Sequence, residues 1–449
     1  MISSADFFST YQYEIEHDFE KDGQPPTWAA GGPQAWGSET AKLPFDEEVK
    51  SIALTLDGSK LAVCLSKEFR VYDTPTHTLL HTVHCPYPSI VHFSPDGDII
   101  AVQMSLRMDG RMEQIVSLVN LDGSSQTLLL SPEAVEEAAR SAATATAAIL
   151  SQQSGESFSS AIESPQILED FTKTVLNIVV IQRERLGRVW RGGMPSFGSY
   201  PFSNDGTLLF YIKPDRKTVV AVDIQETLRR GYTERFTMVQ HEDSVVWAGQ
   251  SPDGKLLATS AWDKFVRLWD PTDGSLLKVL TGATNQSWAA SFSPDSQLIA
   301  AGSGDKQVRV WKTATGELVH FLGGFKGWIR RMQFNPEGTH LVAGAAGGTV
   351  RVFDVMSGDS VQWWQLALPH RGEGFSEISS VQWQGDRILI RTPDGSTVVY
   401  DVQQNRKWEL VATKSNGGQH FYGQTVAAGG GKVVYSTDYD QAIRVWDLD

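Results

Sequence analysis

A unit of about 40 residues recurs along the chain of 449 residues and constrains its fold more than any other feature. The two clearest copies are neighbours: VVWAGQSPDGKLLATSAWDKFVRLWDPTDGSLLKVLTG (245–282) and WAASFSPDSQLIAAGSGDKQVRVWKTATGELVHFLGG (288–324). Each copy has the order strand, Pro-Asp turn, strand, Asp-containing turn, strand, Gly turn, strand. The pattern therefore predicts a series of four-stranded units.

Weaker copies of the unit extend in both directions from this pair. They occupy residues 51–73, 89–104 with 114–123, 200–223, 328–358, 379–402 and 432–449. The third strands of all copies end at Tyr72, Asn120, Val222, Trp269, Trp311, Phe353, Tyr400 and Trp446. We expect about eight units, and seven stays open because the spacing doubles between Asn120 and Val222.

The strands of these units have two faces to bury. Val266 and Leu268 alternate with Arg267 and Trp269, as expected for side chains that point to opposite faces of a strand. A single four-stranded sheet cannot cover both of its faces. Stacking the sheets radially covers each one with its neighbours and leaves only short edges exposed.

These units resemble the WD-repeat (Trp-Asp repeat) family, whose repeats fold as blades of a β-propeller. The resemblance is specific over 241–324, good over 325–358 and 432–447, and degenerate elsewhere, and it covers most of residues 49–449. It implies an all-β fold: a single propeller of about eight blades, seven being possible. In this family a His, a Ser or Thr, an Asp and a Trp form a hydrogen-bonded tetrad, which His241, Thr259, Asp263 and Trp269 match.

The domain organisation follows from the limits of the repeats. Residues 49–449 form the predicted propeller, and the extension 1–48 is expected to supply a closing strand from 11–20 or 39–45, because the last unit lacks a fourth strand. A helical and polar insertion is expected at about 131–175, since residues 131–150 are rich in Ala and Glu after a Ser-Pro start. VLNIVVIQ (175–182) and GRVWRG (187–192) then look like returning strands.

Composition limits the classes of partner and compartment. The formal charge of −14 disfavours phosphate backbones and favours basic or neutral partners, so no nucleic acid is expected. No secretory signal and no long apolar run occurs, so we expect no membrane partner and a cytoplasmic or nuclear location. Cys64 and Cys85, the two cysteines, form neither a disulfide framework nor a metal motif.

Candidate catalytic groups have a structural alternative. His241 and Asp263 could be read as a catalytic dyad, but a buried indole and imidazole need hydrogen-bond partners, and the same slots recur partially as Ser436, Asp440 and Trp446. We therefore favour the structural interpretation. No catalytic order, metal cluster or cofactor fingerprint stands out, so no enzyme activity, cofactor or metal is expected.

The resemblance also implies where a partner binds. Propellers of this family bind mostly on the top face, which carries the loops from outer to first strands and from second to third strands. The positions carried over onto this sequence are Trp262, Gln286, Trp288, Trp328, Arg330, Phe421, Tyr439, Tyr87 and Lys50. Trp, Tyr and Arg dominate binding hot spots. The alternative is that these aromatic side chains pack within loops or plug the channel.

The leading hypothesis is thus a non-enzymatic protein–protein interaction scaffold that binds a protein or peptide, or a multiprotein complex, on the top face. Reading of histone tails is a variant that the net acidity favours but no specific residue supports. The alternative is a propeller enzyme or small-molecule binder that uses the central channel, which should place several His, Asp or Glu at the top of the tunnel. The insertion is a second candidate surface.

Overall fold

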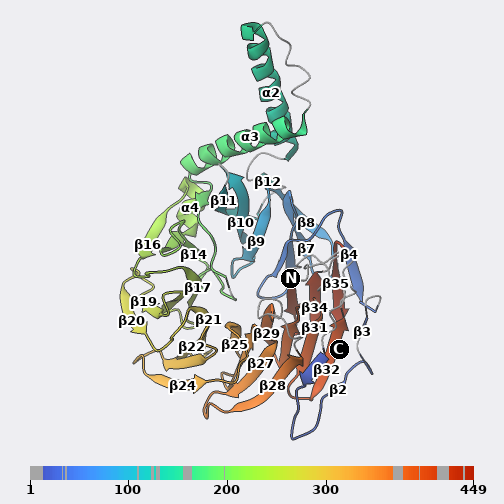
Figure 1. Ribbon diagram of the computed structural model, residues 1–449, viewed down its shortest axis with the longest axis vertical. Coiled ribbons are helices and arrows are strands. Elements are labelled where there is room, and N and C mark those ends of the chain that lie inside the picture. Colours follow the sequence, from blue (N-terminus) through green and yellow to red (C-terminus); the bar gives the residue numbers. More distant parts are fainter. Residues whose placement is uncertain are drawn as a thin grey trace.

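The computed structural model describes residues 14–32, 34–35, 38–108, 111–122, 126–127, 132–154, 164–196, 198–367, 378–393, 395–411, 424–437 and 440–448. Within them, eight antiparallel sheets follow one another around a closed ring (Figure 1). The fold is an all-β propeller of eight blades, which resolves the choice between seven and eight.

Each blade is built from consecutive strands. Blade 1 contains β5 (Ser51–Leu54), β6 (Lys60–Cys64), β7 (Glu68–Asp73) and β8 (Leu79–His84). Blade 2 contains β9 (Pro88–Phe93), β10 (Ile99–Met108), β11 (Arg111–Asn120) and β13 (Trp190–Arg191). Blade 3 contains β14 (Leu208–Ile212), β15 (Val219–Asp223) and β16 (Glu234–Met238). Blade 4 contains β17 (Val245–Gln250), β18 (Leu257–Ala261), β19 (Val266–Trp269) and β20 (Leu276–Leu280).

The remaining blades complete the ring. Blade 5 contains β21 (Ser287–Phe292), β22 (Leu298–Ser303), β23 (Val308–Lys312) and β24 (Leu318–Leu322). Blade 6 contains β25 (Ile329–Phe334), β26 (His340–Ala345), β27 (Thr349–Asp354) and β28 (Ser360–Ala367). Blade 7 contains β29 (Ser380–Gln384), β30 (Arg387–Arg391), β31 (Thr397–Asp401) and β32 (Arg406–Val411). Blade 8 contains β33 (Thr425–Ala428), β34 (Val433–Thr437), β35 (Ala442–Asp447) and β4 (Ala41–Pro44).

The N-terminal extension lies on three blades. Strand β4 pairs antiparallel with β35, Ala442 opposite Pro44, and so provides the fourth strand of blade 8. Strand β1 (Glu14–His17) adds to the outer edge of β28, and β2 (Thr27–Trp28) and β3 (Gln34–Ala35) run parallel to β32. The first and last parts of the chain therefore share one sheet. The domain boundary at residue 48 stays a prediction.

The insertion interrupts blade 2. It carries β12 (Gln126–Thr127), α2 (Pro132–Ser154) and α3 (Pro165–Arg185), and β13 then pairs with β11 to complete the blade. Helix α2 projects from the ring while α3 lies along its edge (Figure 1). The prediction of a strand at 175–182 is wrong: this stretch belongs to α3. Leu176 and Val180, one helical turn apart, pack into the core of blades 1 and 2, which outweighs the β-propensity of the segment.

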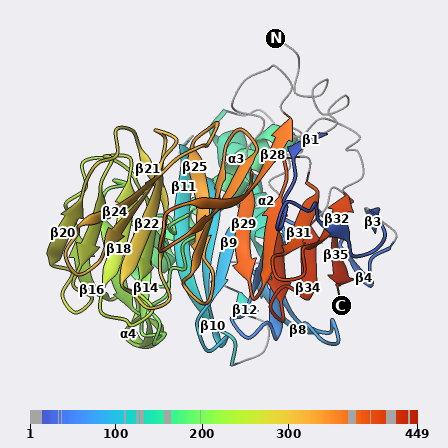
Figure 2. The same ribbon diagram turned by 90° about the horizontal axis from the view of Figure 1, so that it is seen from below.

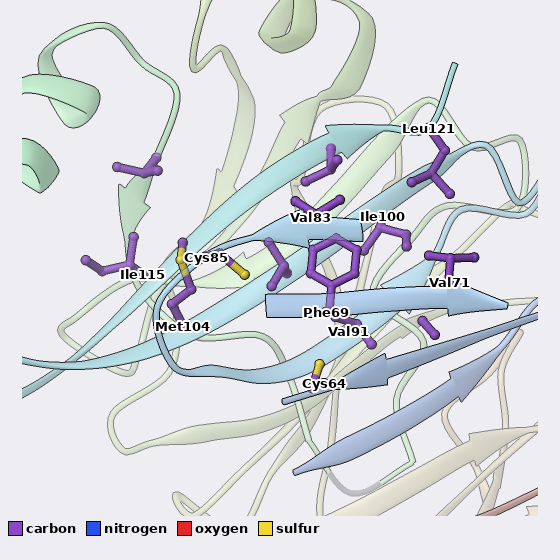
Figure 3. Close-up of a cluster of buried hydrophobic side chains, with 14 of the residues drawn as sticks. Cys64, Phe69, Val71, Val83, Cys85, Val91, Ile100, Met104, Ile115 and Leu121 are labelled. Carbon is purple, nitrogen blue, oxygen red and sulfur yellow. The ribbon is translucent and has the colours of Figure 1, made fainter. Parts of the chain in front are cut away.

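The hydrophobic core lies between adjacent blades. Figure 3 shows one such cluster, in which Phe69 of blade 1 and Ile100 of blade 2 pack beside Cys64 and Cys85. Both cysteines are buried free thiols. Burial raises the pKa of Cys64 to about 12, so this thiol stays protonated and behaves as an apolar core side chain.

Blade 3 departs from the repeat. Its first strand is reduced to the isolated bridges Gly193↔Ile212 and Phe202↔Leu209, and the chain between them swings toward blade 4, where the Ser196 N–H donates to the Val246 carbonyl at 2.8 Å. This segment contains Pro195 and Pro201, which lack the N–H that a regular strand would donate. Figure 2 shows the ring from the side, with α4 (Ile224–Arg230) of this blade on one face.

Candidate functional site

The four tetrad residues form one hydrogen-bonded chain inside blade 4. His241 Nδ1 lies 2.9 Å from Asp263 Oδ2, and His241 Nε2 lies 2.6 Å from Thr259 Oγ1. The Trp269 indole N–H donates to the same hydroxyl at 2.8 Å. The tetrad thus ties the loop before the first strand of blade 4 to its second and third strands.

The charged groups of the tetrad are balanced by hydrogen bonds and ion pairs within blade 4. Burial and the nearby Arg267 hold the pKa of His241 below its usual value, although Asp263 acts in the opposite direction. Burial would raise the pKa of Asp263, but hydrogen bonds from His241 and two backbone N–H groups lower it to about 2. Arg267 Nη1 also donates to Asp263 Oδ2 at 2.6 Å. Since the His241 and Asp263 side chains are only 0% and 3% exposed, this pair serves the fold.

The partial recurrence expected in blade 8 does not form. Ser436 Oγ accepts from Arg391 Nη1 of blade 7 at 2.6 Å, and the buried Trp446 indole N–H has no partner in the described ranges. What recurs instead is an Asp–Arg pair across the turn between second and third strands: Asp263–Arg267, Asp305–Arg309 and Asp440–Arg444. The spacing Asp-x-x-x-Arg was the sequence signal for it.

Four of the predicted rim residues come together on blades 4 to 6. The ring centroids of Trp262 and Trp288 lie 5.2 Å apart, and those of Trp288 and Trp328 lie 5.8 Å apart. The Arg330 guanidinium lies over both Trp288 and Trp328, at 4.4 Å and 5.2 Å from their centroids. At the other end, Arg216 of blade 3 lies 5.3 Å over Trp262. We call these five residues the aromatic ladder.

The ladder is partly exposed and partly interior. Trp262, Trp328 and Arg330 are half-buried and Arg216 is exposed, whereas Trp288 in the middle is only 5% exposed. Trp288 therefore supports its neighbours, as the loop-packing alternative anticipated for the group. The surface available to a partner is formed by Trp262, Trp328 and the two arginines.

Backbone hydrogen bonds hold this rim in place. In each of blades 4 to 6, an N–H in the turn after the second strand donates to a carbonyl in the loop before the first strand. The pairs are Trp262 N to Ser244 O, Gly304 N to Gln286 O and Ala346 N to Trp328 O, at 2.9, 2.8 and 2.8 Å. Because the backbone of the rim is already fixed in this way, little conformational entropy would be lost when a partner binds to it.

The other predicted rim residues lie apart from the ladder. Gln286 takes part through the backbone contact with Gly304 and has no aromatic ring to stack in the ladder. Tyr87 and Lys50 precede the first strands of blades 2 and 1, across the ring from blade 5 (Figure 1); Tyr87 is 59% exposed and Lys50 pairs with Glu48. Phe421 and Tyr439 lie outside the described residues.

Three basic residues of the rim are not among the positions predicted from the sequence. Arg216, Lys264 and Lys306 each directly follow the Asp of the turn between second and third strands, in blades 3, 4 and 5. The signal was the dipeptide Asp-Arg or Asp-Lys at the same place in three successive units. In this turn, the position that the family resemblance marks is the residue before the Asp, such as Trp262, which lies two residues before the basic residue, such as Lys264.

A cavity of about 630 Å³ adjoins the ladder. Its wall comes from blades 2, 3 and 4, where the irregular first strand of blade 3 leaves space, and it includes Gln103, Gln114, Lys213, Arg216 and Trp262. Arg216 and Trp262 thus belong to both the cavity and the ladder. Glu113 is the one Asp, Glu or His in the described wall of this cavity.

Comparison with protein-family models matches the family described as "WD domain, G-beta repeat" to residues 233–270, 274–312 and 316–354. Each match begins one or two residues before the outer strand of one blade and ends at or directly after the third strand of the next. A comparison with curated proteins finds no match. In the described part of the chain, no helix is long and apolar enough to cross a membrane, and no group of three His, Cys, Asp or Glu could hold a metal ion.

Proposed function

The chain is an eight-bladed WD-repeat β-propeller, and from that premise we propose that it is a non-enzymatic scaffold that binds a protein or peptide on its top face at the aromatic ladder. WD-repeat propellers generally mediate protein–protein interactions. The partner is a single protein or peptide, or a multiprotein complex, and neither nucleic acid nor membrane is required.

The observation that carries this proposal is the ladder itself. Three successive blades contribute indoles whose centroids lie 5.2 and 5.8 Å apart, and a guanidinium covers each end. Partly exposed Trp and Arg side chains on a rigid backbone bury large areas with little loss of conformational entropy, which is the profile of a binding hot spot.

The alternative, an enzyme or small-molecule binder of the channel, requires several acid–base side chains from different blades to converge. The adjoining cavity offers Glu113 alone among the described acidic and histidine side chains. This composition favours recognition over acid–base chemistry. We place the scaffold in the cytoplasm or nucleus, where its two buried free thiols stay reduced.

Affinity purification with the full chain tests the proposal. Partners recovered by the unaltered protein should be lost from a variant with Trp328→Ala and Arg330→Ala. They should be retained by Tyr87→Ala, which removes a more exposed aromatic side chain that lies apart from the ladder. Thermal unfolding of each variant shows that the blade is intact. Equal recovery by the double variant would place the binding surface elsewhere.

A further inference from the structure

The rim of blades 3 to 5 is basic although the whole chain is acidic. Arg216, Lys264 and Lys306 are the last residues of three equivalent turns, which we call the basic rim turns (213–216, 261–264 and 303–306). Each backbone N–H of these three residues donates to the carbonyl three residues earlier, at 2.8, 3.2 and 3.2 Å. The same turn therefore presents a cationic side chain in three successive blades.

The backbone at these positions favours glycine. Arg216, Lys264 and Lys306 have φ values of 62, 77 and 67°, in the left-handed region that side chains with a Cβ rarely adopt. Blades 6 and 7 have Gly348 and Gly395 at the same place, with φ values of 71 and 85°. Blades 3 to 5 thus keep a strained basic residue where the fold is more easily built with glycine, which points to a use for the charge.

The turn aspartates beside Arg216 and Lys264 do not neutralise these two cations, because each aspartate is engaged within its own blade. Asp263 binds His241 and Arg267, and Asp305 pairs with Arg309 at 2.9 Å. Arg216 and Lys264 are exposed and have no ion-pair partner in the ranges that the structure describes. Asp215, beside Arg216, is also exposed, but its carboxylate accepts from the Lys217 and Thr218 backbone N–H groups and the Thr218 hydroxyl. Glu242 and Asp243, in the loop before β17, are further exposed acids.

In the ladder next to these turns, arginine side chains already lie over the tryptophan rings. Arg216 occupies a face of Trp262, and Arg330 lies over Trp288 and Trp328. A basic ligand would meet like charge here and would find these aromatic faces covered. This local arrangement contradicts the expectation, drawn from the net charge of −14, that basic partners are favoured.

We propose that the basic rim turns bind an acidic peptide segment of the partner, whose carboxylates contact Arg216, Lys264 and Lys306 while an apolar side chain enters the cavity of about 630 Å³ beside Trp262. This inference rests on the proposed function and narrows it to one class of partner. Charge-assisted hydrogen bonds to carboxylates fix the orientation of the peptide, and the cavity supplies apolar burial.

Selection from a random peptide library displayed against the full chain is the first test. Enrichment of Asp and Glu around an apolar residue supports the proposal. Enrichment of Lys and Arg, lost in the Trp328→Ala and Arg330→Ala variant, would overturn it while leaving top-face binding in place. Selected peptides that bind a variant with Trp262→Ala, Trp328→Ala and Arg330→Ala unchanged would instead contradict the proposed function, because this variant removes the partly exposed tryptophans of the ladder, including the one that lines the cavity.

A triple variant with Arg216→Gly, Lys264→Gly and Lys306→Gly then removes the charges and relaxes the backbone. It should bind the selected acidic peptide roughly tenfold more weakly, with less dependence on salt, and unfold at an equal or higher temperature. Gln441→Gly in blade 8, where φ is 59°, is the matched control that changes backbone freedom without charge and should bind normally. Unchanged affinity of the triple variant would overturn the proposal. The proposal would also be overturned if no peptide were selected and the protein instead bound a labelled oligonucleotide.

Discussion

Trp262 and Trp269 belong to one hairpin but stand in different surroundings. Trp269 is 1% exposed and its indole N–H donates to Thr259 inside the tetrad. Trp262 is half-buried at the rim, between Arg216 and Trp288. The first indole is a part of the blade interior and the second is a part of the proposed binding surface, so their contributions to stability and affinity can be separated by substitution.

We expect Trp269→Phe to lower the free energy of unfolding by about 1–3 kcal/mol, because it removes buried contacts and leaves the Thr259 hydroxyl short of a donor. Trp262→Phe should change stability less and weaken partner binding more. Chemical denaturation and a binding titration measure the two effects. If both substitutions shift stability and affinity in the same proportion, the separation of roles is incorrect.

Acid should destabilise the protein through two histidines, the half-buried His92 and the buried His241. Burial lowers the pKa of His92 to about 4 and also lowers that of His241. Both are neutral when folded, whereas the unfolded chain takes up protons below about pH 6.5, so stability falls as the pH drops through that value. Asp263, with its pKa of about 2, adds a further loss below about pH 4.

Between pH 7 and pH 5, His92 alone should account for about 2 kcal/mol of this loss. Denaturation curves at both pH values measure it. His92→Phe, which keeps a ring near Tyr200 but cannot be protonated, should flatten the pH dependence. A variant with the same slope as the unaltered protein would exclude His92 as the source.

At the scale of elements, the sequence predicted regular blades better than irregular connections. Val266 and Leu268 alternate with Arg267 and Trp269, and a strand of this kind buries both faces only when its sheet packs between two others. The strands of blades 4 and 5 could therefore be predicted from the sequence. The segment 175–182 is rich in β-branched residues and was assigned to a strand. Its helical state depends on Leu176 and Val180 meeting the core of blades 1 and 2, a contact that no local pattern contains.

For the whole molecule, the repeat predicted about eight blades and left seven open, and the family resemblance marked the rim tryptophans. The electrostatic character of the rim followed from neither. A net charge of −14 says nothing about where the charges lie. The repeated Asp-Arg or Asp-Lys dipeptide marks the position of Arg216 in the sequence, but the contact of its guanidinium with Trp262 joins two blades and is visible only in the structure. The cavity could not be predicted from the sequence either, because it depends on how the chain between the bridges at Gly193 and Phe202 packs against blade 4.

Ring closure should depend on β4. A chain that begins at residue 38 keeps this strand, and one that begins at residue 46 loses it together with Leu43 and Phe45, which pack against Ile443. We expect the shorter chain to be less stable by at least about 5 kcal/mol, from lost backbone hydrogen bonds and apolar burial. Comparing the two chains by denaturation isolates β4, and a synthetic peptide of residues 38–48 should restore stability. Equal stability of both chains would refute this role.

The pairing of β4 with β35 also affects the order of events during synthesis. The ribosome makes β4 before any blade and β35 after all of them. The last sheet therefore cannot be completed until all the strands before β35 have emerged, and β4 must wait without its partner until β35 is made. A chain whose translation stops early keeps an open ring with an unpaired edge, which is the kind of surface that chaperones and proteases recognise.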